Sequence, residues 1–431
     1  MKQILKIFHG DVLLFGITFS GYGVISFLVT DANSSQSITI PYRVITLFLN
    51  LFFLLKHFQI IKCGVFSATK NSIALLRKNV VIWPLLTILI AYSFRVLHAV
   101  ITDPPASLLS QEPSIYLQFW FLISLLPALN FLFLDRAKSE NYLFITWLMH
   151  AFIGVSILFL DVSSKEIGGA GRLSGAALNP ISLGHYSVSL VTTSLFIWLR
   201  TQTSLNLLFG KPILKYLYIA TGVIGTTGML LSASRGPFIA QIVCIILILL
   251  NSSKLSLGFI IKILALVSAC FLAIFLSGDS SSTLIDRLIN STDAEIGDDN
   301  RSSMNRGSLY DLTIRMIQQS PMIGSGIELP DGNAYPHNLI LEAFLTMGFP
   351  GGLIFLSLLF FITIKSVQVL NYKNSLADWG WVGALFIQYL VNAMFSGSLY
   401  SSALFWYSLF AMVGLCSFRK LRKEQVWRYL K

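Results

Sequence analysis

Three polar segments interrupt a strongly apolar chain, and each contains a side chain that could bind an anion or transfer a proton. The first spans residues 232–237 (SASRGP), a short connection between two long apolar runs. Pro237 suits the first turn of the following helix and Gly236 allows a close backbone turn, which would fix Arg235 at the helix end. A guanidinium binds phosphate or carboxylate through paired hydrogen bonds. The alternative role for Arg235 is an interfacial anchor that reaches phospholipid headgroups.

The second segment, residues 168–175 (GGAGRLSG), is rich in glycine and carries Arg172. Its glycines would let the main chain approach a ligand and aim amide groups at an anion. Asn179 and Pro180 follow at the expected start of the next helix, whose N-terminal dipole also favours an anion. A flexible loop that happens to contain an arginine is the competing interpretation.

The third segment ends at Tyr335-Pro336-His337-Asn338, where a long polar stretch meets an apolar run. Histidine titrates near neutral pH and can accept or donate a proton, so His337 is a candidate general base. Its competing role is to cap or anchor the helix. Glu342 follows inside the apolar run. Carboxylates at membrane depth are usually partnered and functional, although Glu342 could simply pair with an arginine.

Other kinds of site have little support. Acidic residues between Asp293 and Asp299 could bind a divalent cation, but a solvated loop explains them better. The sequence has no nucleotide-phosphate loop, no cysteine and histidine spacing typical of metal sites, and no serine hydrolase elbow. None of the four cysteines falls in the long polar stretch, so no disulfide framework is expected there. We therefore predict neither a metal nor a cofactor.

The elements that position these segments must lie in lipid. The chain has 431 residues, of which 55% are hydrophobic and only 12% charged, and its mean hydropathy is +0.72. Apolar runs recur near the roughly 20 residues needed to cross a bilayer, where only helices satisfy their own backbone groups at this hydrophobicity. We predict an all-α polytopic membrane protein with about twelve transmembrane helices. The expected spans are 11–30, 41–60, 79–100, 115–134, 142–162, 178–199, 213–232, 236–251, 257–277, 338–366, 379–396 and 402–418.

Residues 1–431 are expected to form a single membrane domain with one extracytoplasmic loop subdomain at 278–337. The first apolar run resembles a signal peptide, but no small-residue cleavage site follows it, so it is interpreted as a retained span. Within the loop, residues 303–319 predict an amphipathic helix, which Pro321 ends. Its apolar face comprises Leu309, Leu312, Met316 and Ile317.

The formal net charge of +11 is explained by topology and not by a nucleic-acid partner. With both termini in the cytoplasm, the cytoplasmic loops and tails carry 22 of the 31 basic residues, in agreement with the positive-inside rule. One more, Arg95, falls within a span. Because lysine would satisfy a topology bias equally well, an excess of arginine on the opposite face indicates anion binding there. The basic residues of that face are Arg43, Lys165, Arg172, Arg235, Arg287, Arg301, Arg306 and Arg315.

At these segments the sequence resembles the O-antigen ligase and polymerase superfamily of bacterial surface polysaccharide assembly. The likeness covers about residues 165–365, whereas the first five spans match only in hydropathy. Three short blocks carry it: Arg172-Leu173-Ser174-Gly175 with Asn179-Pro180; Ser234-Arg235-Gly236; and Arg306 through Pro321, Gly324 and Gly326 to His337-Asn338, Glu342, Gly348 and Gly351.

The resemblance implies a metal-independent glycosyltransferase of GT-C-like architecture in the bacterial inner membrane, with a periplasmic active site. Its donor would be a glycan linked to undecaprenyl pyrophosphate. By position, Arg172 and Arg235 would hold the pyrophosphate, and His337 would activate the acceptor hydroxyl. Stabilising the charge on the departing pyrophosphate is the largest electrostatic task. The other substrate-binding positions would be Arg306, Arg315, Asn338, Glu342, Ser234 and Asn179.

The acceptor differs within this superfamily. A polymerase transfers the growing chain to another lipid-linked repeat unit, a ligase transfers it to lipid A-core, and a related branch glycosylates protein. Arg315 and Gly326 are separated by ten residues, a spacing that favours the polymerase. Further expected partners are membrane lipid and the chain-length regulator and flippase of the same pathway.

A protein of a different class, a lipid-linked oligosaccharide flippase or secondary transporter, would also explain the span count and the orientation. It would predict a half-to-half repeat and charges at membrane depth, and the sequence offers little of either. A non-catalytic scaffold for the export machinery is a third alternative, and it would not need the set Arg172, Arg235 and His337.

Overall fold

The structure is a computed structural model, and it describes a subset of the chain. The described residues are 9–27, 29, 35–58, 79–102, 112–159, 178–200, 212–252, 306–330 and 335–417. Within these ranges the regular elements are all helical, as apolar runs of this length predict. Arg172, the expected span 257–277 and residues 278–305 of the expected loop lie outside the described residues.

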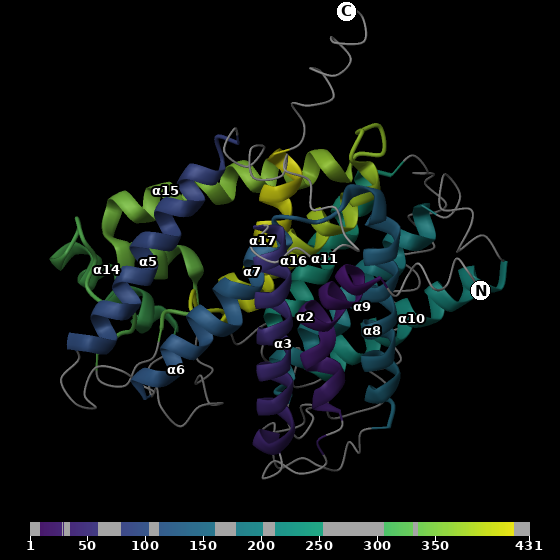
Figure 1. Cartoon of the computed structure of the whole chain (residues 1–431), viewed down its shortest axis with the longest axis horizontal. Helices are drawn as coiled ribbons and strands as arrows, with labels where there is room; N and C mark the ends of the chain where they lie inside the picture. Colours follow the sequence, from purple (N-terminus) through teal and green to yellow (C-terminus); the bar gives the residue numbers. More distant parts are fainter. Residues whose placement is uncertain are drawn as a thin grey trace, which may run out of the picture. The chain divides into compact units, whose positions relative to one another are not determined.

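A helix covers most of every expected span that the structure describes (Figure 1). The expected span 115–134 consists of three consecutive helices, of which η2 is a π-helix. The elements are α2 (Gly10–Ser26), α3 (Ser35–His57), α5 (Ile82–Thr102), α6 (Pro113–Leu117), η2 (Gln118–Leu125), α7 (Leu126–Phe131), η3 (Arg136–Lys138), α8 (Ser139–Ile157), α9 (Pro180–Arg200), α10 (Pro212–Leu231), α11 (Arg235–Leu250), α14 (Arg306–Gln319), α15 (Leu339–Leu370), η4 (Ala377–Trp379), α16 (Gly380–Ser396) and α17 (Ala403–Ser417).

Four helical stretches among the described residues are long and apolar enough to cross a membrane. They are Ser37–His57, Ile82–Thr102, Pro113–Phe131 and Leu339–Leu370. Shorter apolar helices span Gly10–Ser26, Arg235–Leu250 and Ala403–Cys416. The total of about twelve crossings and the extracytoplasmic loop therefore stay predictions.

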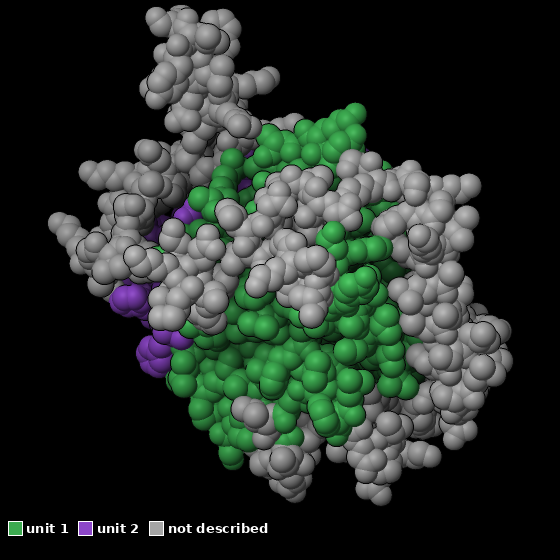
Figure 2. Space-filling model, turned by 90° about the vertical axis from the view of Figure 1, so that its right-hand side faces the viewer, with its two compact units in different colours: residues 1–46, 136–294, 366–396 green, residues 47–135, 295–365, 397–431 purple. Residues whose placement is uncertain are grey.

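The chain divides into two compact units, which Figure 2 colours separately. Unit 1 comprises residues 1–46, 136–294 and 366–396. Unit 2 comprises residues 47–135, 295–365 and 397–431.

Helix α9 is the centre of unit 1, where it packs against α8, α10, α11 and α16. Small residues allow this packing. A Cβ atom at Gly225 of α10 would lie 2.7 Å from the Ser187 carbonyl oxygen, and one at Gly154 of α8 would lie 2.5 Å from the Leu190 side chain. Because lipid offers helices no hydrophobic driving force to associate, such close backbone approach is a main source of their attraction.

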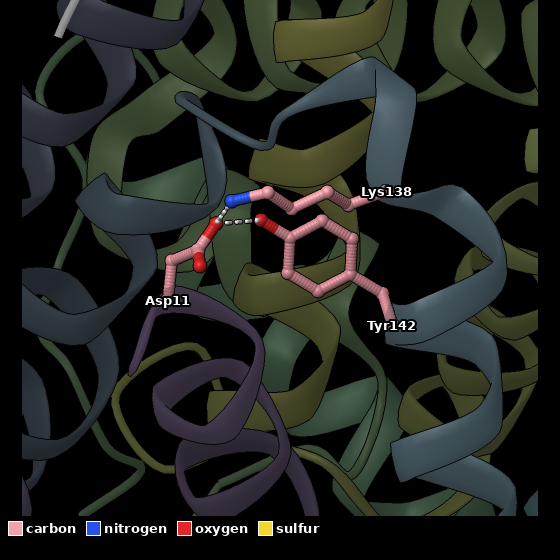
Figure 3. Close-up of polar contacts among 3 residues, drawn as sticks. All are labelled: Asp11, Lys138 and Tyr142. Atoms are coloured by element: carbon pink, nitrogen blue, oxygen red, sulfur yellow. Dashed lines mark hydrogen bonds and ion pairs between the residues drawn. The ribbon is translucent and has the colours of Figure 1, made fainter. Parts of the chain in front are cut away.

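A polar contact joins the beginnings of α2 and α8 in unit 1 (Figure 3). The Lys138 ammonium lies 2.7 Å from Asp11 Oδ2, and the Tyr142 hydroxyl donates to the same oxygen over 3.0 Å. All three residues fall at the end of the helices that the charge pattern assigns to the cytoplasm. The contact therefore fixes the start of α2 against the start of α8.

Aromatic packing holds the helices of unit 2 together. Trp120 of η2 lies edge-on to Tyr92 of α5, with ring centroids 4.7 Å apart, and to Trp406 of α17 at 5.3 Å. All three side chains are fully buried. The unit thus has an aromatic centre shared by three of its helices.

In unit 2 the segment after α14 is seated on α15 through two glycines with positive φ. Gly324 has φ +79°, and a Cβ atom there would lie 2.5 Å from the Thr346 carbonyl group. Gly348 has φ +66° and breaks α15, and a Cβ atom there would lie 2.7 Å from the Pro321 carbonyl oxygen. Only glycine adopts this conformation at such a close approach without strain. The motif glycines therefore have a structural role at this seat.

The seat also exchanges backbone hydrogen bonds. The Ser325 amide donates to the Leu345 carbonyl over 2.7 Å, and Phe349, the residue that would pair with that carbonyl in an unbroken helix, donates to Pro321 over 2.6 Å. Arg95 of α5 adds a bond from Nη2 to the Gly324 carbonyl at 3.1 Å. The loop thus supplies the pairing that the break in α15 removes.

The predicted amphipathic helix is confirmed as α14, from Arg306 to Gln319. Its Leu309 and Ile317 are buried in a cluster with Leu329 and Leu345 of unit 2. Leu312 and Met316 pack on the same cluster. The apolar face expected from the sequence is thus the buried face.

Candidate active site

The turn from Ser232 to Pro237 joins α10 to α11 in unit 1 and holds a strained residue. Ala233 has φ +47°, a left-handed conformation that costs a side-chain-bearing residue free energy. The hydroxyl of Ser232 donates to the Met229 carbonyl at 2.7 Å, and that of Ser234 donates to the Ser232 carbonyl at 3.1 Å. The turn is thus tied by its own side chains, and the Ser234 hydroxyl points inward.

The N-terminus of α11 has no side-chain cap. Ser234 occupies the N-cap position but makes no capping hydrogen bond to the helix amides. The first amides of a helix lack partners within the helix, and together with the helix dipole they attract anions. Arg235, whose side chain is partly exposed, is the first residue of α11. Uncapped amides and a guanidinium therefore occur at the same helix end.

Two neighbouring helices of unit 1 back this turn. A Cβ atom on Gly184, in the second turn of α9, would lie 2.8 Å from both Ser232 Oγ and Pro237. A Cβ atom on Gly236 would lie 3.1 Å from Phe395 Cβ near the end of α16. Because α9 and α16 both pack closely against it, the turn has a fixed orientation relative to these two helices.

His337 precedes α15 in unit 2 and is the second described non-glycine residue with positive φ, at +52°. The next residue, Asn338, caps the helix. Its Oδ1 accepts from the amides of Ile340 at 3.0 Å and Leu341 at 3.1 Å. The His337 ring is partly exposed and lies against Tyr335, with ring centroids 4.5 Å apart. Side-chain capping of α15 is thus the role of Asn338, and His337 is held just outside the helix.

Glu342 is fully buried one turn into α15. Both of its carboxylate oxygens accept from the Leu399 amide, each at 2.9 Å, and the Tyr92 hydroxyl lies next to the same carboxylate. The described residues provide no arginine as an ion-pair partner for it. Glu342 therefore holds the segment before α17 through that segment's backbone.

A second acidic residue, Glu328, was not singled out by the sequence analysis and lies in the segment that was expected to be a polar loop. It is 5% exposed, and the Tyr400 hydroxyl donates to its Oε1 over 3.4 Å. Burial, followed by the charge of Glu328, raises the pKa of Tyr400 well above its usual value. The Tyr400 ring is edge-on to that of Tyr335, with centroids 6.1 Å apart. These contacts link Glu328 to His337 through two tyrosines.

The remaining predicted site residues lie at the start of α9 and on α14. Asn179 is exposed, and its Oδ1 accepts from the Ser182 amide at 2.8 Å, which caps α9. Arg315 is exposed on α14, and Arg306 is the first residue of that helix. Because Arg235 lies in unit 1 and His337 in unit 2, the convergence of these two residues with Arg172 stays a prediction.

A known protein family matches the region of the chain that contains two of the three sequence blocks. Residues 220–356 match the family model described as O-antigen ligase, which includes Arg235, His337 and Glu342 but neither Arg172 nor Asn179. No curated protein sequence matches the chain. Over these residues, the family match confirms the resemblance to the O-antigen ligase and polymerase superfamily.

Proposed function

We propose that this chain is a glycosyltransferase of the bacterial inner membrane that takes its glycan from an undecaprenyl-pyrophosphate donor on the periplasmic side. The family match supports a ligase-type or polymerase-type role in surface polysaccharide assembly. Within that role we favour the polymerase, on the spacing of Arg315 and Gly326. Transfer to lipid A-core is the alternative outcome.

One observation carries the proposal. The two described non-glycine residues with positive φ, Ala233 and His337, lie in two of the motifs that the sequence singles out for chemistry. Such strain costs about 1–3 kcal/mol per residue, persists only where the surrounding structure enforces it, and is frequent at active sites. The strain is therefore concentrated where an anion site and a general base are expected.

The donor would bind at the start of α11. The uncapped amides and Arg235 supply only hydrogen-bond donors, which suits the acceptor oxygens of a pyrophosphate. Arg172 would contribute a second guanidinium. As the bond between the anomeric carbon and the pyrophosphate oxygen breaks, these donors would stabilise the negative charge that develops on the leaving group.

The acceptor would bind beside His337. The acceptor hydroxyl oxygen would attack the anomeric carbon and form the new glycosidic bond, while His337 accepts the hydroxyl proton. Undecaprenyl pyrophosphate would leave with the electron pair of the broken bond. Glu342 is engaged by the Leu399 amide, so we assign it a positioning role.

The test is transfer in vitro by the purified full-length protein, with the undecaprenyl-pyrophosphate glycan as sole donor and EDTA present. A ladder on a gel without lipid A-core supports a polymerase, and product only when lipid A-core is added supports a ligase. Loss of product on adding EDTA would contradict metal independence. Arg43→Ala is the matched control, because Arg43 is an arginine of the same expected face that lies outside the three motif segments and packs over the Tyr22 ring.

A wild-type protein that makes no product with either acceptor would contradict the transferase. In that case, movement of the labelled donor across proteoliposomes would support the flippase or transporter instead.

A further inference from the structure

Helix α16 carries two buried carboxamides one turn apart, Gln388 and Asn392. Gln388 is fully paired: its Nε2 donates to the His185 carbonyl at 3.0 Å and to Ser189 Oγ at 2.7 Å, and its Oε1 accepts from Thr192 at 3.1 Å. These bonds join α16 to α9 in unit 1. Gln388 therefore shows that α9 can supply hydrogen-bond partners to a buried side-chain amide of α16.

The side-chain amide of Asn392 makes no hydrogen bond with the described part of the chain. Asn392 is 1% exposed, and neither its Nδ2 nor its Oδ1 has a hydrogen-bond partner. Buried polar side-chain atoms are nearly always paired with protein or water, so an amide with both ends unpaired requires an explanation. Both ends of this amide are therefore available to bind a ligand.

The position of Asn392 points to the ligand. A Cβ atom on Gly236 would lie 3.8 Å from Asn392 Oδ1 and 3.7 Å from the Asn392 carbonyl oxygen. The amide thus lies against the residue that follows Arg235, at the uncapped end of α11. A molecule whose phosphates bind at that helix end would therefore lie close to α16.

We propose that Asn392 is a specificity-determining residue that binds the sugar attached to the pyrophosphate. This inference rests on the proposed function. Arg235 and the helix amides can only donate, which suits phosphate oxygens, whereas a carboxamide both donates and accepts. A sugar hydroxyl or acylamino group matches it, since each offers a donor and an acceptor. Asn392 lies outside the matched family region of residues 220–356.

The experiment compares the affinities of two probes for the full-length protein in nanodiscs. One probe is undecaprenyl pyrophosphate, and the other is the lipid-linked repeat unit purified from the source cells. Asn392→Leu keeps the approximate volume and removes both hydrogen-bonding ends. We expect it to weaken binding of the repeat unit about 10-fold and to leave binding of undecaprenyl pyrophosphate unchanged.

Gln388→Leu is the matched control, because it removes an internally paired amide from the same helix. It should lower the melting temperature without changing the ratio of the two affinities, whereas Asn392→Leu should leave the melting temperature of the free protein unchanged or raised. Equal affinity of wild type and Asn392→Leu for the repeat unit would overturn the inference, and the amide would then be paired by buried water. Equal weakening for both probes would also overturn it, since the contact would be to phosphate.

Failure of the proposed function can be distinguished from failure of the inference about Asn392. If wild type binds neither probe, the donor assignment is wrong and the inference falls with it. If wild type binds and transfers glycan while Asn392→Leu behaves identically, only the inference is wrong.

Discussion

The turn before α11 in unit 1 and the turn before α15 in unit 2 share one construction but differ in their caps. Each places a left-handed residue, Ala233 or His337, shortly before a helix starts. In unit 2 the amides are occupied by the Asn338 side chain, whereas in unit 1 no side chain caps the helix. A capped end can present a base without attracting an anion, and an uncapped end retains its affinity for one. The difference supports our proposal that the general base lies at the turn before α15 and that the phosphate binds at the turn before α11.

The strongest way to break this comparison is to remove the proposed base. His337→Asn should reduce the transfer rate about 10²- to 10⁴-fold, because asparagine tolerates the left-handed conformation but cannot accept the proton. Initial rates at saturating acceptor would measure the effect. An unchanged melting temperature would exclude misfolding as its cause, and a rate within threefold of wild type would refute the role of His337.

Removal of the guanidinium at the uncapped end should have the next largest effect. Arg235→Ala should lower the rate about 10²- to 10³-fold, as loss of one donor to a developing anion does, and should weaken binding of undecaprenyl pyrophosphate. Arg235→Lys should recover part of the rate, since a single charge replaces a forked donor. If Arg235→Ala loses no more than Arg43→Ala, the turn before α11 is not the anion site.

The caps themselves can be compared through stability. Asn338→Ala should cost about 1 kcal/mol of folding free energy because it leaves the Ile340 and Leu341 amides unpaired. Ser234→Ala should cost less, since its hydroxyl makes no capping bond. Thermal unfolding in detergent would measure both. Equal losses would mean that the two helix ends are capped alike.

The smallest expected effect concerns pH. Because burial raises the pKa of Tyr400 in the folded protein, its contribution to stability is fully present below the unfolded value near 10 and is lost as the pH rises through the folded value. Tyr400→Phe should therefore flatten the decline in melting temperature between about pH 9 and 11. An identical decline in the variant would show that other groups cause it.

The sequence predicted the helices well, because the length of an apolar run depends on the membrane and not on its neighbours. Pro321 marked the end of α14, and the 3.6-residue period identified its buried face. Partners distant in sequence could not be predicted. Glu342 is paired with the backbone of Leu399, and Glu328 is buried although its segment has the composition of a solvated loop.

The sequence predicted which types of residue would form the site. The structure shows which of those side chains are already hydrogen-bonded within the protein. Asn338 and Asn179 belong to the expected motifs, yet both act as helix caps. Asn392 could not be identified, since a single asparagine in an apolar run carries no pattern until its neighbours are known. Which polar groups remain unpaired depends on packing between elements, and the sequence does not determine that locally.

The close packing at Gly324 and Gly348 limits which part of unit 2 can move. Lifting the segment off α15 would strip hydrogen bonds from Phe349 and Leu345 within an apolar helix. Each unpaired backbone group there would cost several kcal/mol. The segment is therefore held fixed on α15, and we do not expect it to open and close as a lid.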